Sequence, residues 1–247
     1  GQPGVRTPDP RSKEVRGIFV TLNDERYYCI RNVDKIPPFF LSLVSDRDHW
    51  IFVASNGGVT AGRVSPDKAL FPYVTVDKIY DSTPHTGCKT LLRVEVQGKR
   101  HYWEPFNREH DGRFETTRNL YKSTVGNKLL FEEINHDLNL GFRYAWACSD
   151  TYGFVRQVEL ENLGRTGCRV DLVDGLQNIL PAGTPRTVQA SASYLVDAYK
   201  WSELDESTGL AQYTLFSGIS DRAEPRESLR ANTVFCLGLD GRQVLLS

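Results

Sequence analysis

The sequence lacks several features that would assign it to a common class of protein. Methionine is absent, and the five histidines show none of the spacings that metal ligands adopt. No apolar run approaches the roughly 20 residues that a membrane-spanning helix needs. Charge is balanced at 30 basic and 31 acidic residues, so no strong field attracts nucleic acid or an anionic membrane. We therefore expect a soluble protein that binds neither nucleic acid nor membranes and uses no metal or other cofactor.

Cysteine is also sparse and irregularly placed. The five cysteines are odd in number and include no Cys-x-x-Cys pair: Cys29, Cys88, Cys148, Cys168 and Cys236. This spacing argues against a zinc ribbon and against a framework of disulfides. We expect reduced thiols packed as small apolar side chains, which slightly favours a cytoplasmic protein without fixing the compartment.

The familiar catalytic motifs are missing as well. The sequence contains no Gly-x-Ser-x-Gly elbow, no Gly-x-Gly-x-x-Gly loop, no P-loop, no His-Glu-x-x-His pair and no EF-hand loop. Several acids lie beside aromatic or apolar residues, and we expect each to be a solvated carboxylate on a strand face or in a turn: Glu104, Glu132, Glu133, Asp137 and Asp174. The two acids of a glycosidase converge only in the folded chain, so spacing alone assigns no catalytic residue.

What is present indicates strands. Residues 1–13 hold three prolines and two glycines, so we expect a flexible N-terminal arm there. From residue 14 onward the apolar segments are short, rich in Val, Ile, Tyr, Phe and Thr, and bounded by turn residues. The expected strands are 17–22, 27–31, 39–44, 50–54, 90–96, 101–103, 128–134, 138–148, 154–161, 168–173, 190–199, 211–216 and 233–239.

These strands predict the fold class. Alternating apolar and polar residues in 154–161 and 168–173 are typical of antiparallel sheets with one buried face. More than a dozen strands are too many for one open sheet, and stacking two large sheets buries them. No repeat of fixed period indicates a propeller or a solenoid. We predict an all-β fold, a single large antiparallel two-sheet β-sandwich over 14–247, with under a tenth of the residues in helix.

The stretch 48–81 is the densest in candidate functional residues. A strand there ends in a turn whose glycines let a partner approach the backbone closely. Charges and aromatics follow over a long connection, which is more often functional than idle, and Trp103 would add a ring face for a pyranose. The candidates for contact with a sugar or another domain are Asn56, Gly57, Gly58, Arg63, Asp77, Lys78, Asp81, Trp103 and Glu104. The alternative is a rigid loop in which Arg63 and Asp77 pair with each other.

The order of features in residues 48–106 resembles the start of the cellobiose and chitobiose phosphorylase-like proteins. In that family a strand leads to a Gly-rich turn, an irregular segment with Arg and Asp follows, and an aliphatic strand and a Trp-x-Pro element close the pattern. The matching residues here are Asn56-Gly57-Gly58, then Arg63, Asp77 and Asp81, then Leu91, Leu92 and Val94, and finally Trp103-Glu104-Pro105. The later run 153–181 is similar to a pair of strands in the same family.

The resemblance implies a β-supersandwich of the galactose-mutarotase-like kind, which in such proteins precedes an (α/α) toroid that carries the catalytic acid. It implies that this chain is the N-terminal, non-catalytic part of a longer glycoside phosphorylase or hydrolase. Its partners would be a sugar or oligosaccharide and the C-terminal catalytic domain of the same polypeptide, with a homodimer as a further option. The sugar, the linkage and the reaction stay open.

Two other functions stay open at this point. One is a structural or oligomerisation β-domain. The other is a mutarotase-type sugar epimerase, which needs a general acid and a general base across one sugar ring. His101 or His136 with Glu132 would fill those roles, although nothing in their spacing requires it.

Overall fold

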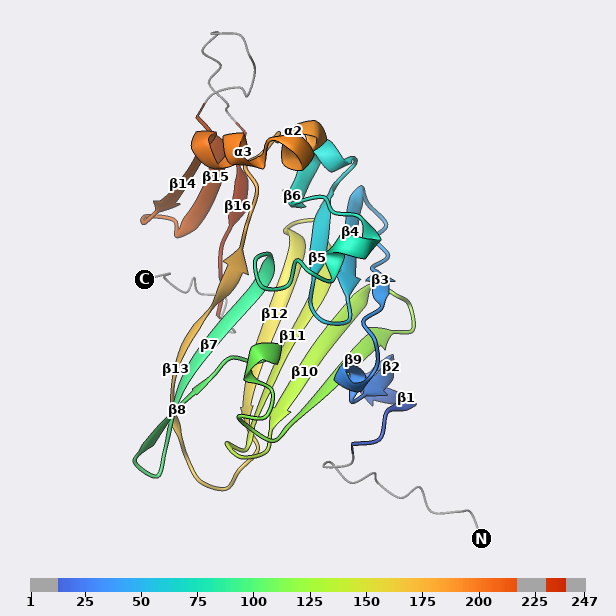
Figure 1. Cartoon of the computed structure of the whole chain (residues 1–247), viewed down its shortest axis with the longest axis vertical. Helices are drawn as coiled ribbons and strands as arrows, with labels where there is room; N and C mark the ends of the chain where they lie inside the picture. Colours follow the sequence, from blue (N-terminus) through green and yellow to red (C-terminus); the bar gives the residue numbers. More distant parts are fainter. Residues whose placement is uncertain (1–12, 217–229, 239–247) are drawn as a thin grey trace. The chain divides into compact units, whose positions relative to one another are not determined.

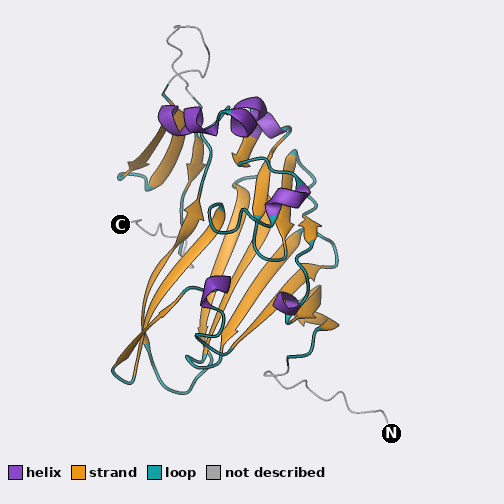
Figure 2. Cartoon of the chain, viewed as in Figure 1, coloured by secondary structure: helices purple, strands orange, loops and turns teal. Residues whose placement is uncertain are grey.

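Strands dominate the structure. The computed structural model describes residues 13–216 and 230–238. Of the described residues, 51% lie in strands and 12% in helices, as the colouring of Figure 2 shows. The all-β class is confirmed, whereas the helix content exceeds the expected tenth. The predicted N-terminal arm lies, except for residue 13, outside the described residues.

The described part of the chain divides into two compact units. The first unit consists of 13–47, 54–57 and 89–175, and the second consists of 48–53, 58–88, 176–216 and 230–238. The prediction of a single domain over 14–247 stays a prediction, because units of this kind also occur as parts of one domain.

The first unit contains a six-stranded antiparallel sheet in the order β1-β2-β9-β10-β11-β12. Its strands are β1 (Arg16–Leu22), β2 (Glu25–Arg31), β9 (Thr116–Ser123), β10 (Lys128–Asn135), β11 (Leu140–Ser149) and β12 (Gly153–Asn162). Figure 1 shows β9 to β12 running side by side. A tight hairpin joins β1 and β2, in which Asn23 and Asp24 have φ values of 48° and 64°.

A three-stranded sheet, β13-β7-β8, packs against this larger sheet. Its strands are β7 (Gly87–Val96), β8 (Lys99–Trp103) and β13 (Arg169–Gln177). The Trp103 ring meets the Phe142 ring of β11 edge to face at 6.5 Å. Arg156 of β12 forms a bidentate ion pair with Asp174 of β13 at 2.6 and 2.8 Å. Side chains from the two sheets therefore interdigitate, which confirms the two-sheet antiparallel β-sandwich.

Short elements complete the first unit. They are η1 (Val33–Lys35), β3 (Phe40–Ser42) and η3 (Arg108–His110). The turn that follows β4 (His49–Ala54) also belongs here, because Ser55 and Phe39 exchange two hydrogen bonds. In one the Ser55 N–H donates to the Phe39 carbonyl at 2.8 Å, and in the other the Phe39 N–H donates to Ser55 Oγ at 3.0 Å.

The second unit combines short strands with the longer helices. Strand β5 (Val59–Arg63) pairs antiparallel with β4 and with β6 (Ala69–Phe71), and a separate sheet holds β14 (Lys200–Asp205), β15 (Leu210–Leu215) and β16 (Asn232–Val234). The helices are η2 (Pro66–Lys68), α1 (Val76–Ile79), α2 (Arg186–Ser191) and α3 (Ser193–Tyr199). The strand expected over 190–199 is wrong, because α2 and α3 occupy it. The three alanines of that stretch favour helix over strand.

Neither a membrane-spanning helix nor a metal cluster is found in the part of the chain that the structure describes. None of the helices there has the length and apolarity that crossing a bilayer requires. Within the same residues, His, Cys, Asp and Glu side chains form no group of three or more that could hold a metal ion.

Candidate binding site on the first unit

A buried carboxylate lies at the centre of the sandwich. Glu133 of β10 is 1% exposed and points toward the three-stranded sheet. Its Oε1 accepts a hydrogen bond from Trp103 Nε1 at 2.8 Å. Its Oε2 accepts from the Arg118 Nε at 2.6 Å and from the Phe106 N–H at 2.7 Å. Because both oxygens are bonded and one partner is a cation, the burial of this charge is compensated.

Glu133 holds the segment after β8 in an unusual conformation. Phe106 has a φ of 66°, in the left-handed region, which costs a non-glycine residue on the order of 1–3 kcal/mol. The hydrogen bond from its N–H to Glu133 offsets this cost. So does the packing of its ring, whose centroid lies 5.2 Å from that of Tyr144 and 6.3 Å from that of Phe131. The turn that leads into η3 is therefore fixed by the core of the sandwich.

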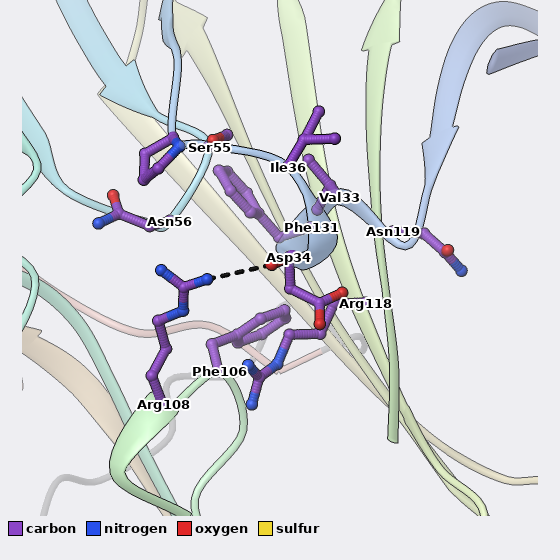
Figure 3. Close-up of a pocket in the computed structure, with 11 residues that line it drawn as sticks. Val33, Asp34, Ile36, Ser55, Asn56, Phe106, Arg108, Arg118, Asn119 and Phe131 are labelled. Carbon is purple, nitrogen blue, oxygen red and sulfur yellow. Dashed lines mark hydrogen bonds between the residues drawn. The ribbon is translucent and has the colours of Figure 1, made fainter. Parts of the chain in front are cut away.

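This turn forms one side of a small cavity, drawn in Figure 3. The cavity has a volume of about 30 Å³. Five segments contribute to it: η1 and the residues after it, the turn after β4, the segment from Phe106 to η3, β9 and β10. Its lining residues are Val33, Asp34, Ile36, Pro38, Ser55, Asn56, Phe106, Arg108, Arg118, Asn119 and Phe131.

One carboxylate oxygen of the cavity, in Asp34, has no hydrogen-bond partner among the described residues. Arg108 Nη2 donates to the backbone carbonyl of Asp34 at 3.1 Å, the dashed line of Figure 3. The Asp34 carboxylate pairs through Oδ2 with Lys35 at 2.7 Å. Its Oδ1 is buried and has no hydrogen-bond partner among the described residues. A buried carboxylate oxygen without a donor is costly, so a donor brought by a ligand would be favoured there.

The size of the cavity limits what it can enclose. A volume of 30 Å³ holds about two water-sized groups. Pockets that enclose a whole small-molecule ligand usually measure about 300 Å³ or more. The site can therefore receive one edge of a ligand but not a whole sugar ring.

A second buried carboxylate lies on the opposite face of the six-stranded sheet. Glu132 precedes Glu133 on β10, and successive side chains on a strand point to opposite faces. It accepts hydrogen bonds from Asn119 Nδ2 and the Tyr121 hydroxyl, each at 2.7 Å, and from Arg143 Nε at 2.5 Å. Burial, followed by the charge of Glu132, raises the pKa of Tyr121 above its ordinary value.

The expectation that these acids are solvated is wrong for Glu132 and Glu133. Glu132 is 4% exposed and Glu133 is 1% exposed, because a basic or amide side chain faces each of them from the neighbouring strand. Asp174 is also held, by the bidentate pair with Arg156. Asp137 instead accepts a hydrogen bond from the backbone N–H of Glu115 at 2.8 Å, at an exposed position.

Four of the sequence-predicted site residues belong to the first unit. Asn56 lines the cavity, and Gly57 beside it adopts a φ of 97° that suits glycine. Trp103 is 3% exposed, so the prediction that its ring face stacks on a sugar is wrong: the ring is used in the core. Glu104 forms an ion pair with Lys89. Partial burial acts to raise the pKa of Glu104, but hydrogen bonds from Lys89 and Asn107 outweigh it, and the pKa lies below its ordinary value.

The other five predicted residues belong to the second unit. Arg63 forms an ion pair with Asp48 at 2.7 Å, so the alternative in which Arg63 pairs with Asp77 is wrong. Asp77 lies in the first turn of α1, and a hydrogen bond from the Thr75 side chain lowers its pKa. Gly58 is needed sterically, because a Cβ there would lie 2.0 Å from a backbone carbonyl oxygen. Lys78 and Asp81 are exposed.

The groups considered for a mutarotase are not brought together. Glu132 faces away from the three-stranded sheet, whereas His101 belongs to β8 of that sheet and packs its ring against Phe114 at 6.4 Å. His136 Nε2 lies 2.8 Å from Thr117 Oγ1, just beyond the end of β10. No general acid and base across one sugar ring follows from this placement.

Sequence reasoning missed Asp34, Arg108 and Arg118. Arg108 follows the predicted Trp103-Glu104 element by a few residues, which is the only signal that pointed near it. No protein-family model matches the sequence, and no curated protein is significantly similar to it.

Proposed function

We propose that this chain is a non-catalytic β-sandwich domain of a larger carbohydrate-active enzyme, a glycoside phosphorylase or hydrolase. In this role it contributes to carbohydrate binding and packs against a catalytic domain of the same polypeptide, which carries the acid that protonates the leaving oxygen. The proposal extends the resemblance of residues 48–106 to the cellobiose and chitobiose phosphorylase-like proteins.

The hydrogen bonding of the two buried carboxylates, Glu132 and Glu133, is the observation that most supports a non-catalytic role. Glu132 and Glu133 each accept three hydrogen bonds, and an arginine is among the donors in both cases. A general acid must hold a proton and deliver it to a substrate that it reaches. A buried carboxylate whose two oxygens accept three hydrogen bonds from the protein, one of them from an arginine, is suited to fixing the fold instead.

The convergence of two predicted elements gives additional support. Asn56 and the segment after Trp103 are nearly 50 residues apart in the sequence, and both border the same cavity. A cavity lined by polar groups from separate segments of the chain is typical of a binding site rather than of a packing gap between sheets.

Two measurements on the purified chain test the proposed function. We expect binding to at least one class of oligosaccharide on a glycan array. We also expect no hydrolysis, phosphorolysis or mutarotation of aryl-glycosides and free sugars. Failure to bind any glycan would overturn the proposal. Turnover that disappears in Glu132→Gln, but persists in the exposed-site control Glu159→Gln, would overturn it in favour of an epimerase or hydrolase.

A further inference from the structure

We propose that the cavity between η1, the turn after β4 and η3 binds one edge of a neutral sugar. A hydroxymethyl group or two adjacent hydroxyls would enter it, with Asp34 as the acceptor and Arg108 and Asn56 as donors. This inference rests on the proposed function and names the site and the ligand class through which the domain contacts carbohydrate.

The unused acceptor is the first reason. The Asp34 side chain is 14% exposed, its Oδ2 is paired with Lys35, and its Oδ1 is buried without a partner among the described residues. A ligand hydroxyl donates one hydrogen bond and accepts others, so it satisfies Oδ1 and also accepts from a neighbouring donor. An anionic ligand would instead bring a second negative charge against the Asp34 carboxylate.

The charge balance around the cavity is the second reason. Arg118 is neutralised by Glu133 at 2.6 Å and by Asp111 at 2.9 Å. Arg108 donates to the backbone carbonyl of Asp34, and Lys35 pairs with the Asp34 carboxylate through Oδ2. Three cationic and three anionic side chains therefore meet here, which favours a neutral polar ligand over phosphate or a carboxylate.

The rigidity and shape of the cavity are the third reason. Figure 3 shows Asn56 and Arg108 on one side of the Phe106 and Phe131 rings, with Asp34 and Arg118 on the other. Glu133 fixes the Phe106 turn through a 2.7 Å hydrogen bond, so the backbone on this side of the cavity needs little ordering when a ligand binds. The volume of about 30 Å³ admits the two heavy-atom groups of one sugar edge and no more.

The test compares two probes on the whole chain by titration calorimetry and NMR. We expect methyl β-D-glucoside to bind and to shift the side-chain amide signal of Asn56, whereas inorganic phosphate does neither. Asp34→Ala removes the acceptor and should weaken glucoside binding about tenfold or more, as loss of a hydrogen bond to a charged group does. The matched control Asp150→Ala, an exposed carboxylate paired with Arg47 in the same unit, should leave affinity unchanged.

Each contrary result has a definite meaning. Equal glucoside affinity in Asp34→Ala and the wild type, with unchanged melting temperature, overturns the site while glycan binding elsewhere keeps the proposed function. Phosphate binding that Arg108→Ala abolishes, without any glucoside binding, also overturns it and marks an anion site. If Asp34→Ala fails to fold, Asn56→Ala decides, because it removes a donor from the rim, and unchanged affinity there counts against the site. A glycan array without binding overturns both this site and the proposed function.

Discussion

Two arginine–carboxylate pairs of similar length have different surroundings. Arg118 and Glu133 lie 2.6 Å apart in the first unit with side chains 9% and 2% exposed. Arg63 and Asp48 lie 2.7 Å apart in the second unit with side chains 56% and 41% exposed. Water screens the charges of Arg63 and Asp48. Arg118 and Glu133 are removed from water, so each charge would be left buried and uncompensated if the other were lost. The distance between the charged atoms therefore does not show which of the two pairs contributes more to the stability of the fold.

The two pairs also differ in what they are connected to. Glu133 bonds a strand neighbour, a tryptophan of the facing sheet and the backbone of a strained turn, so its loss affects all three. Arg63 bonds Asp48 across the adjacent strands near the start of β4. Four substitutions test whether buried contacts stabilise the protein more than exposed ion pairs do. They are given from the largest expected effect to the smallest.

Removing the buried carboxylate should have the largest effect. Glu133→Ala leaves Arg118 buried without its main counter-ion and leaves the Trp103 and Phe106 N–H groups unbonded. We expect the free energy of unfolding to fall by about 3–5 kcal/mol, measured by urea denaturation. Glu159→Ala, at a 58% exposed side chain of β12, should change the urea midpoint little. Equal effects of the two substitutions would contradict the contrast.

In the second unit, we expect the close approach of Gly58 to the backbone of α1 to affect the free energy of unfolding more than any exposed charge does. The Cβ of Gly58→Ala would lie 2.0 Å from the carbonyl oxygen of Ile79, so the backbone must shift. We expect a loss of about 1–3 kcal/mol in the free energy of unfolding, as for other overpacked sites. Gly167→Ala is the control, because a Cβ there meets nothing within 4 Å. A neutral Gly58→Ala would show that α1 moves freely.

The ion pair of Glu104 with Lys89 should give a pH-dependent contribution of intermediate size. The folded pKa of Glu104 lies below its ordinary value of 4.5. Its contribution to stability is therefore fully present above about pH 4.5 and is lost as the pH falls through the folded pKa. We expect Glu104→Gln to lower the urea midpoint at neutral pH and to converge with the wild type in acid. A difference that grows toward acid would refute this sign.

The exposed pair should give the smallest effect. Arg63→Ala removes a bond to Asp48 that solvent screens on both sides, so we expect no measurable shift of the urea midpoint. The same comparison in high salt should also show no difference. A clear loss of stability would mean that this pair is coupled to the packing of the β4–β5 hairpin.

Most of the strands were predictable because turn residues mark their ends. Strand β9 was not, since its sequence is polar although most of its residues are buried. Its Arg118 and Asn119 are compensated by Glu133 and Glu132, their register partners on β10. Such compensation arises only when the strands are paired, so the sequence alone indicates a polar loop.

The site was partly predictable for a similar reason. Asn56 was found because turn chemistry is local, and a Gly-rich turn after a strand is visible in the sequence. Asp34 and Arg108 were not, because their importance comes from meeting each other across 74 residues of chain. Arg63 was predicted as a contact residue because it lies among charges of alternating sign. Such charges are more often solvated than functional.

One titration that compares the two regions tests the proposed sugar site most directly. Methyl β-D-glucoside is titrated into the wild type, Arg108→Ala and Arg63→Ala, each checked for an unchanged melting temperature. We expect Arg108→Ala to lose most of the affinity and Arg63→Ala to keep the wild-type value. The opposite ranking, with binding lost in Arg63→Ala and kept in Arg108→Ala, would contradict the proposal.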